Sequence, residues 1–120
     1  MSEVVMLHIV AAALIVFAAI FHSLMGGEKL IEPTLAVEDT FIQEPMTQAI
    51  TRFGWHSSSG FFLLTALMLV LPGVPSLLHA ATGGLWLVLG LTNLAMLKAK
   101  HPGGYLLSLI GVLTLAGVYV

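Results

Sequence analysis

Histidines are the residues of this chain best suited to chemistry, and three of the five share one spacing. The pairs are His22 with Gly26, His56 with Gly60 and His79 with Gly83, each four residues apart. On a helix, four residues make about one turn, so both members of a pair lie on one face. Histidine is an axial ligand of haem iron, and a haem lies flat beside the helix that binds it. A glycine one turn away leaves room for this plate, so the spacing predicts ligation of a b-type haem.

Helix packing is the competing interpretation of the same spacing. Small residues one turn apart let membrane helices approach closely without any cofactor. His8 is followed at the fourth position by Ala12, which is small but is not glycine. Both interpretations therefore stay open at the level of sequence.

Long apolar blocks must position these histidines. The chain of 120 residues is 58% hydrophobic and only 8% charged, whereas soluble domains are roughly a quarter charged. Blocks of about 18 or more apolar residues can cross the roughly 30 Å of hydrocarbon in a bilayer, and lipid favours helices because every backbone group must be bonded within the segment. We predict one all-α domain, residues 1–120, that forms a four-helix transmembrane bundle. The predicted spans are residues 4–25, 54–71, 76–98 and 103–120.

Helix breakers and charge define the connections. The pair Gly26-Gly27 is expected to end the first span, which leaves an inner loop at residues 27–52. Pro45 suits a first helical turn, so the second helix either begins ahead of the membrane or is preceded by a short amphipathic segment in the interface. The N-terminal run lacks a basic region and a cleavage site, so we expect a retained span rather than a signal peptide.

The basic residues all fall in two connections. Lys29 and Arg52 lie in the first, and Lys98 and Lys100 lie in the third. The positive-inside rule places these connections in the cytoplasm and both termini outside, so the bundle is antiparallel. With this topology His8 and His79 form an outer pair, whereas His22, His56 and His101 form an inner group.

The inner group could alternatively bind a metal ion. His22, His56 and His101 with Glu28 could supply nitrogen and oxygen ligands to zinc, copper or iron. The chain has no cysteine, which excludes thiolate sites, and its net charge of −2 gives no reason to expect a nucleic-acid partner.

Three segments together resemble a group of small, uncharacterised bacterial four-helix membrane proteins. They are FHSLMGGEKLIEP, RFGWHSSS and KAKHPGGY. The first is similar to a His-Ser-x-x-Gly-Glu motif followed by Leu-Ile-x-Pro, and the second to an Arg-x-x-Trp-His-x-x-Ser motif. The match covers residues 22–33 and 52–59 and departs from the pattern by one inserted glycine before Glu28. The resemblance implies a bacterial inner membrane but no activity, and it points to the inner group around His22, Glu28, Arg52 and His56.

The leading functional hypothesis is a small membrane cofactor-binding protein. His22 and His56 would ligate a haem b or a metal at the inner side, and His79 with His8 would form a second, outer site. Its role would be electron transfer, alone or as a small subunit of a membrane redox complex, which requires no catalytic residue of the protein. A non-catalytic subunit that docks through its glycine faces against a larger complex or a second copy is the alternative. A small transporter is less favoured, because broken spans and an inverted repeat are missing.

Overall fold

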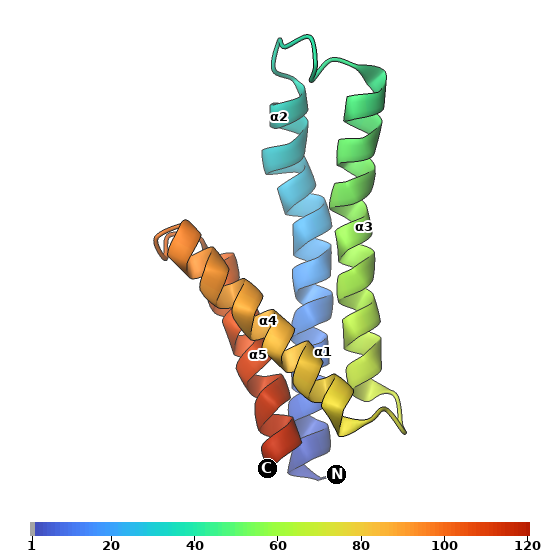
Figure 1. The fold of residues 1–120 in the computed structure, drawn as a ribbon, viewed down its shortest axis with the longest axis vertical. Coiled ribbons are helices and arrows are strands. Elements are labelled where there is room, and N and C mark those ends of the chain that lie inside the picture. Colours follow the sequence, from blue (N-terminus) through green and yellow to red (C-terminus); the bar gives the residue numbers. More distant parts are fainter. Residues whose placement is uncertain (1) are drawn as a thin grey trace.

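The computed structural model of the protein describes residues 2–120, and these fold into helices with short connections (Figure 1). Helix α1, Glu3–Phe21, continues without a break through the π-helix η1, His22–Ile31, into the short α2, Glu32–Leu35. The remaining helices are α3, Pro45–Val70, α4, Ser76–Met96, and α5, Pro102–Tyr119. Four helical columns, with α1–η1–α2 counted as one, are long and apolar enough to cross a membrane. The predicted all-α fold with four membrane-spanning helices is confirmed.

The first column does not end at Gly26-Gly27, and that prediction is wrong. The helix passes through both glycines with π-type bonding, as shown by the Glu32 backbone N–H that donates to the Gly27 carbonyl. The column of 33 residues is about 50 Å long at 1.5 Å per residue, which exceeds the roughly 30 Å of hydrocarbon. About 20 Å of the column therefore extends beyond the membrane core.

Helix α3 extends beyond the membrane core in the same direction. It begins at Pro45, where the missing backbone N–H costs nothing because first-turn donors have no helical partner. The structure thus favours the extended second helix over an amphipathic segment lying in the interface. The predicted inner loop, residues 27–52, shrinks to the connection at residues 36–44.

The helices pair as two hairpins that diverge. The α1–η1–α2 column packs along α3, and α4 packs along α5, while α1 and α5 join the two hairpins. In Figure 1 the α4–α5 hairpin crosses the other hairpin obliquely, and its tip lies away from η1. Both termini lie at one end of the molecule, which we call the terminal end, and the α2–α3 connection lies at the opposite end, the loop end (Figure 1).

A core of small and branched side chains joins the hairpins around one tryptophan. Trp86 of α4 is 1% exposed, and its indole N–H donates to the Thr65 hydroxyl of α3 at 3.2 Å. Its ring meets Phe62 edge-on with centroids 4.8 Å apart. The other core residues are Ala11, Ala12, Ile15, Ala18, Ala66, Leu69 and Ile110.

Close approach of backbones holds α4 against α5. A Cβ added at Gly111 of α5 would lie 2.5 Å from the backbone nitrogen of Leu87 on α4. Only glycine permits this contact, which is the small-residue packing typical of membrane helices.

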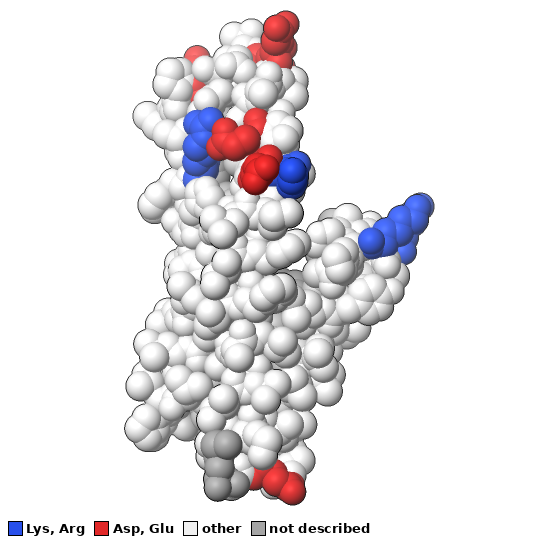
Figure 2. All heavy atoms as spheres, turned by 180° about the vertical axis from the view of Figure 1, so that it is seen from behind, with Lys and Arg blue, Asp and Glu red and all other residues white. Residues whose placement is uncertain are grey.

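Charged side chains gather at the loop end (Figure 2). Figure 2 shows acidic and basic residues beside one another there, lysines at the tip of the α4–α5 hairpin, and a body almost free of charge. Large apolar side chains on this body are exposed, for example Phe17 at 57% and Leu85 at 52%. An uncharged, apolar surface between charged ends is what a membrane-spanning protein presents to lipid.

Candidate functional site at the contact between η1 and α3

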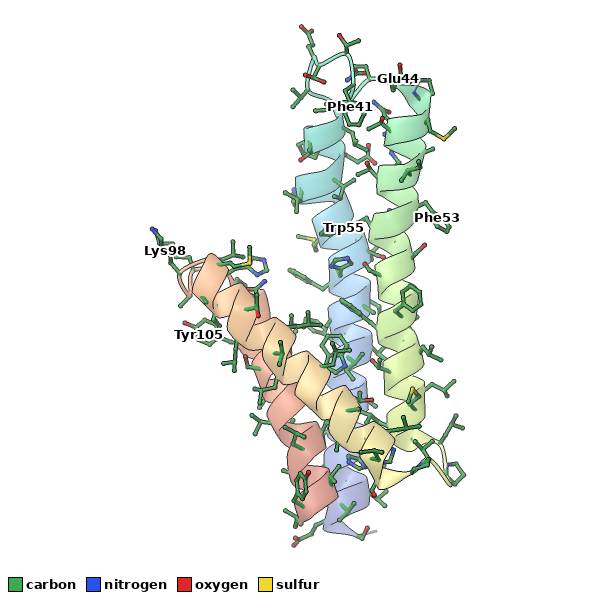
Figure 3. The ribbon with its side chains drawn as sticks, viewed as in Figure 1. Phe41, Glu44, Phe53, Trp55, Lys98 and Tyr105 are labelled. Atoms are coloured by element: carbon green, nitrogen blue, oxygen red, sulfur yellow. The ribbon has the colours of Figure 1, made fainter. Side chains whose placement is uncertain are left out.

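The Trp55 indole is the centre of the inner group. Trp55 projects from α3 toward η1 (Figure 3), and its ring stacks on the His22 imidazole with centroids 3.9 Å apart and planes 15° apart. The indole N–H donates to the His22 carbonyl at 2.9 Å. A Cβ at Gly26 would lie 2.5 Å from Cζ2 of the same indole. The histidine and the glycine one turn away therefore do contact one flat ring, and that ring belongs to the protein.

Hydrogen bonds fix the proton on His22. Its Nε2 lies 2.8 Å from the Ser58 hydroxyl, which also donates to the Trp55 carbonyl. A hydroxyl has a single proton, so Ser58 must accept from His22, which therefore carries its proton on Nε2. Phe62 covers another side of the imidazole at a centroid distance of 5.3 Å. His22 is thus fixed between three residues of α3.

His56 forms the reciprocal contact from α3 to η1. Its Nδ1 lies 3.1 Å from the Ser23 hydroxyl, and Ser23 lies 2.7 Å from the Ser59 hydroxyl. The ring passes across Gly27, where a Cβ would lie 3.3 Å from Cε1. Adjacent bulky residues, Trp55 and His56, thus pack against adjacent glycines.

The serine pair also determines the tautomer of His56. Ser59 is buried, at 7% exposure, and an unpaired buried donor costs about 1–3 kcal/mol. All hydroxyl protons find acceptors only if Ser59 donates to Ser23 and Ser23 donates to His56 Nδ1. The imidazole proton is then on Nε2, and His56 is an exposed residue.

An ion pair between Arg52 and Glu32 joins the extended helices at the loop end. Arg52 of α3 donates from Nε and a terminal nitrogen to the two carboxylate oxygens of Glu32, at 2.8 and 3.0 Å. Lys29 pairs with Glu28 at 3.3 Å, and both side chains are largely exposed. Each cation of η1 and α3 therefore has its own carboxylate partner.

His101 lies on the other hairpin and has a structural role. Its Nδ1 accepts the Gly103 backbone N–H at 3.1 Å, which caps the start of α5. Within residues 2–120, no group of three or more His, Cys, Asp or Glu side chains is placed to hold a metal ion. The predicted ligands His22, His56, His101 and Glu28 are engaged in the separate contacts described above.

The outer histidines meet at the terminal end. The rings of His8 and His79 have centroids 4.5 Å apart and lie edge to face. His8 Nε2 donates to the Thr114 carbonyl at 3.3 Å, and His79 Nε2 donates to the Met68 carbonyl at 3.1 Å. Carbonyls only accept, so both rings carry a proton on Nε2.

The two remaining glycines of the repeated spacing do not contact a histidine. A Cβ at Gly83 would meet Leu115 of α5 at 2.9 Å, and a Cβ at Gly60 would have no neighbour within 4 Å. Helix packing therefore explains Gly83. At Gly60 the structure provides no contact that requires glycine.

Haem does not fit either histidine pair as the side chains are arranged. At the inner pair Trp55 occupies the place of the plate, and His22 Nε2 carries a proton that it donates to Ser58. At the outer pair both Nε2 atoms donate to carbonyls. Ligation would require each of these contacts to break, and it stays a prediction.

The sequence patterns singled out the histidines and glycines and gave no role to Trp55, Ser23, Ser58 or Ser59, so the part of these residues in the cluster was missed. A usable signal was present, because Trp55-His56 and Gly26-Gly27 are complementary in size. Two adjacent large rings on one helix can pack only against a correspondingly small surface. The two pairs lie far apart in the sequence, so their complementary sizes are not apparent from either segment alone.

Comparison with known proteins gives no further assignment. A scan against models of protein families, a search of curated proteins and a search of solved structures found no match. The resemblance of residues 22–33 and 52–59 to small bacterial membrane proteins therefore stays a prediction.

Proposed function

We propose that the protein is a small integral membrane cofactor-binding protein that takes part in electron transfer, alone or as a small subunit of a redox complex. The observation that carries the proposal is the reciprocal bonding of two imidazoles. His22 of η1 bonds Ser58 of α3, and His56 of α3 bonds Ser23 of η1. Ionisable groups at membrane depth are costly and usually mark function.

The depth of this cluster suits a site at a membrane surface. Twenty residues counted from Glu3 make about 30 Å of helix, which is the thickness of the hydrocarbon. His22 therefore lies at the boundary between acyl chains and headgroups. A cofactor bound there would be accessible from the membrane and from a partner protein at the surface.

We further propose the orientation given by the basic residues. Lys29, Arg52, Lys98 and Lys100 would face the cytoplasm of a bacterium, with both termini on the outer side of the inner membrane. The inner cluster is then on the cytoplasmic side. A reporter fused to the C-terminus tests this orientation, because it would be active only in the periplasm.

The test of the cofactor proposal is the content of the purified protein. An absorption spectrum, elemental analysis and mass spectrometry of an organic extract should find one cofactor near equal stoichiometry. His22→Ala and His56→Ala should reduce that stoichiometry at least severalfold. His101→Asn is the matched control, because asparagine preserves the helix cap and the residue lies outside the cluster. Protein that carries no cofactor, although its membranes contain haem and quinone, would contradict the proposal.

A docking subunit is the second candidate, and the divergence of the hairpins favours it. The tip of the α4–α5 hairpin lies away from η1 (Figure 1), so inner faces of both hairpins have no partner helix from this chain at that level. A membrane helix of a larger subunit could pack closely against these faces. Recovery of a defined complex that persists in the His22→Ala, His56→Ala double variant would support docking without a cofactor.

A further inference from the structure

An apolar groove leads away from the His56 cluster along the seam of α1 and α3. A hollow of about 280 Å³ lies between the helices beside Ser23, Ser59 and Leu63. A second hollow, of about 330 Å³, continues from Leu63 to Val70. Leu63 lines both, so the two hollows lie next to each other along the seam.

The length of the groove matches one leaflet of a bilayer. Val70 lies eleven positions after Ser59, a rise of about 17 Å on a helix, and half of the hydrocarbon thickness is about 15 Å. The walls are almost wholly apolar, with Ala12, Ala13 and Ala66 among them. A single hydrocarbon or isoprenoid tail fits such a groove.

The end of the groove at the membrane surface is polar. Ser23 and Ser59 line the groove and also hold His56 in place. Because Nδ1 accepts from Ser23, the exposed His56 ring offers its Nε2–H as a donor beside Gly27, one turn beyond Ser23. A ligand head beside this end would therefore supply a hydrogen-bond acceptor.

The charged side chains around the polar end of the groove favour a ligand with an uncharged head group. Arg52 is paired with Glu32, and Lys29 with Glu28, so the cations of η1 and α3 are already balanced by carboxylates. An anionic phosphate would gain no unpaired cation from these helices and would lie near two acids. A carbonyl oxygen accepts the imidazole proton without that penalty.

We propose that this groove binds an isoprenoid quinone. One head carbonyl accepts from His56 Nε2–H, and the tail lies along Leu63 between α1 and α3. The inference rests on the proposed function, because the quinone is then the cofactor that the inner cluster holds. A quinone would be held by a hydrogen bond to His56 and not by ligation to a histidine, so its binding leaves the Trp55–His22 stack intact.

The test is titration of the full-length protein, in nanodiscs of neutral phospholipid, with a benzoquinone that bears a ten-carbon tail. A Trp86→Phe background leaves Trp55 as the only indole, so quenching of its emission reports binding beside His56. We expect saturable quenching, and a dissociation constant at least tenfold higher in His56→Ala. His56→Gln, which keeps an N–H donor, should recover part of the loss.

Groove variants separate the proposed path from general partition into lipid. Ala13→Phe fills the groove from an exposed position of α1 and should weaken binding at least severalfold. Ile9→Phe, also exposed but outside the groove, should leave binding unchanged. Equal quenching in the parent protein, His56→Ala and Ala13→Phe would overturn the proposal, with circular dichroism confirming that each variant is folded.

The remaining outcomes distinguish this inference from the proposed function. If anionic phospholipid displaces the quinone at similar mole fraction, the groove is a lipid site and the quinone assignment is wrong. If no quinone binds but purified protein contains haem or a metal, the inference fails and the proposed function stands. If neither quinone nor any other cofactor is bound, both fail.

Discussion

Replacing Gly26 with alanine should push the Trp55 indole away from His22. The added Cβ would lie 2.5 Å from Cζ2 of Trp55, well inside van der Waals contact. The indole cannot simply retreat, because its N–H is bonded to the His22 carbonyl at 2.9 Å and its face is stacked on the His22 ring. Relief of the clash therefore disturbs both interactions.

The expected loss in the free energy of unfolding follows from these contacts and from a matched control. Overpacking typically costs about 1–3 kcal/mol, and loss of one hydrogen bond adds about 0.5–1.5 kcal/mol. Alanine also gains up to about 1 kcal/mol of helix propensity over glycine. Gly60→Ala has the same gain and no neighbour within 4 Å of its Cβ. The difference between the two variants should therefore be about 2–4 kcal/mol, with Gly26→Ala less stable.

The measurement is the free energy of unfolding in mixed micelles titrated with a denaturing detergent, followed by circular dichroism. In a Trp86→Phe background, the emission of Trp55 should change in Gly26→Ala and remain as in the parent in Gly60→Ala. Equal stability and equal emission of the two variants would refute the packing of Trp55 between His22 and Gly26.

Three further substitutions test packing between helices and backbone conformation, each by the same unfolding titration. Gly111→Ala places a Cβ 2.5 Å from the backbone of α4 and should cost about 1–3 kcal/mol, whereas Gly84→Ala, with nothing within 4 Å, should not destabilise; equal losses would contradict the close contact. Ala99→Gly should stabilise the protein by about 0.5–1 kcal/mol, because φ is +56° and the left-handed conformation costs alanine more than glycine loses in chain entropy; a loss of stability would contradict it. Trp86→Phe removes the bond to Thr65 and should cost about 1–2 kcal/mol, and combination with Thr65→Val should be non-additive; strict additivity would show that the bond contributes nothing.

The number of spans was predictable because the membrane imposes one length on every crossing. Each block had to supply about 18 apolar residues, and Pro72 or Pro102 with neighbouring glycines separated the last three. The relative level of His8 and His79 along the spans was predictable for the same reason. Counting residues along each span placed His8 and His79 at one level, and their rings lie 4.5 Å apart.

The end of the first helix was not predictable from local propensity. Gly26-Gly27 is a strong breaker signal in isolation, yet Trp55 and His56 from another helix pack on the two glycines. A glycine that weakens a lone helix can favour a helical pair, because the missing side chain admits a partner ring. Nothing in the sequence of the first span indicated which side chains of another helix would pack on these glycines.

Sequence alone therefore determined the four apolar spans and which histidines share a level, His8 with His79 and His22 with His56, because hydrocarbon thickness and helix rise are fixed quantities. Only the tertiary structure decided what each histidine touches. The rotation of a helix about its own axis decides whether its histidine faces a cofactor or stacks on Trp55. This rotation depends on side-chain packing between residues more than thirty positions apart. The fit of Trp55-His56 against Gly26-Gly27 fixes it.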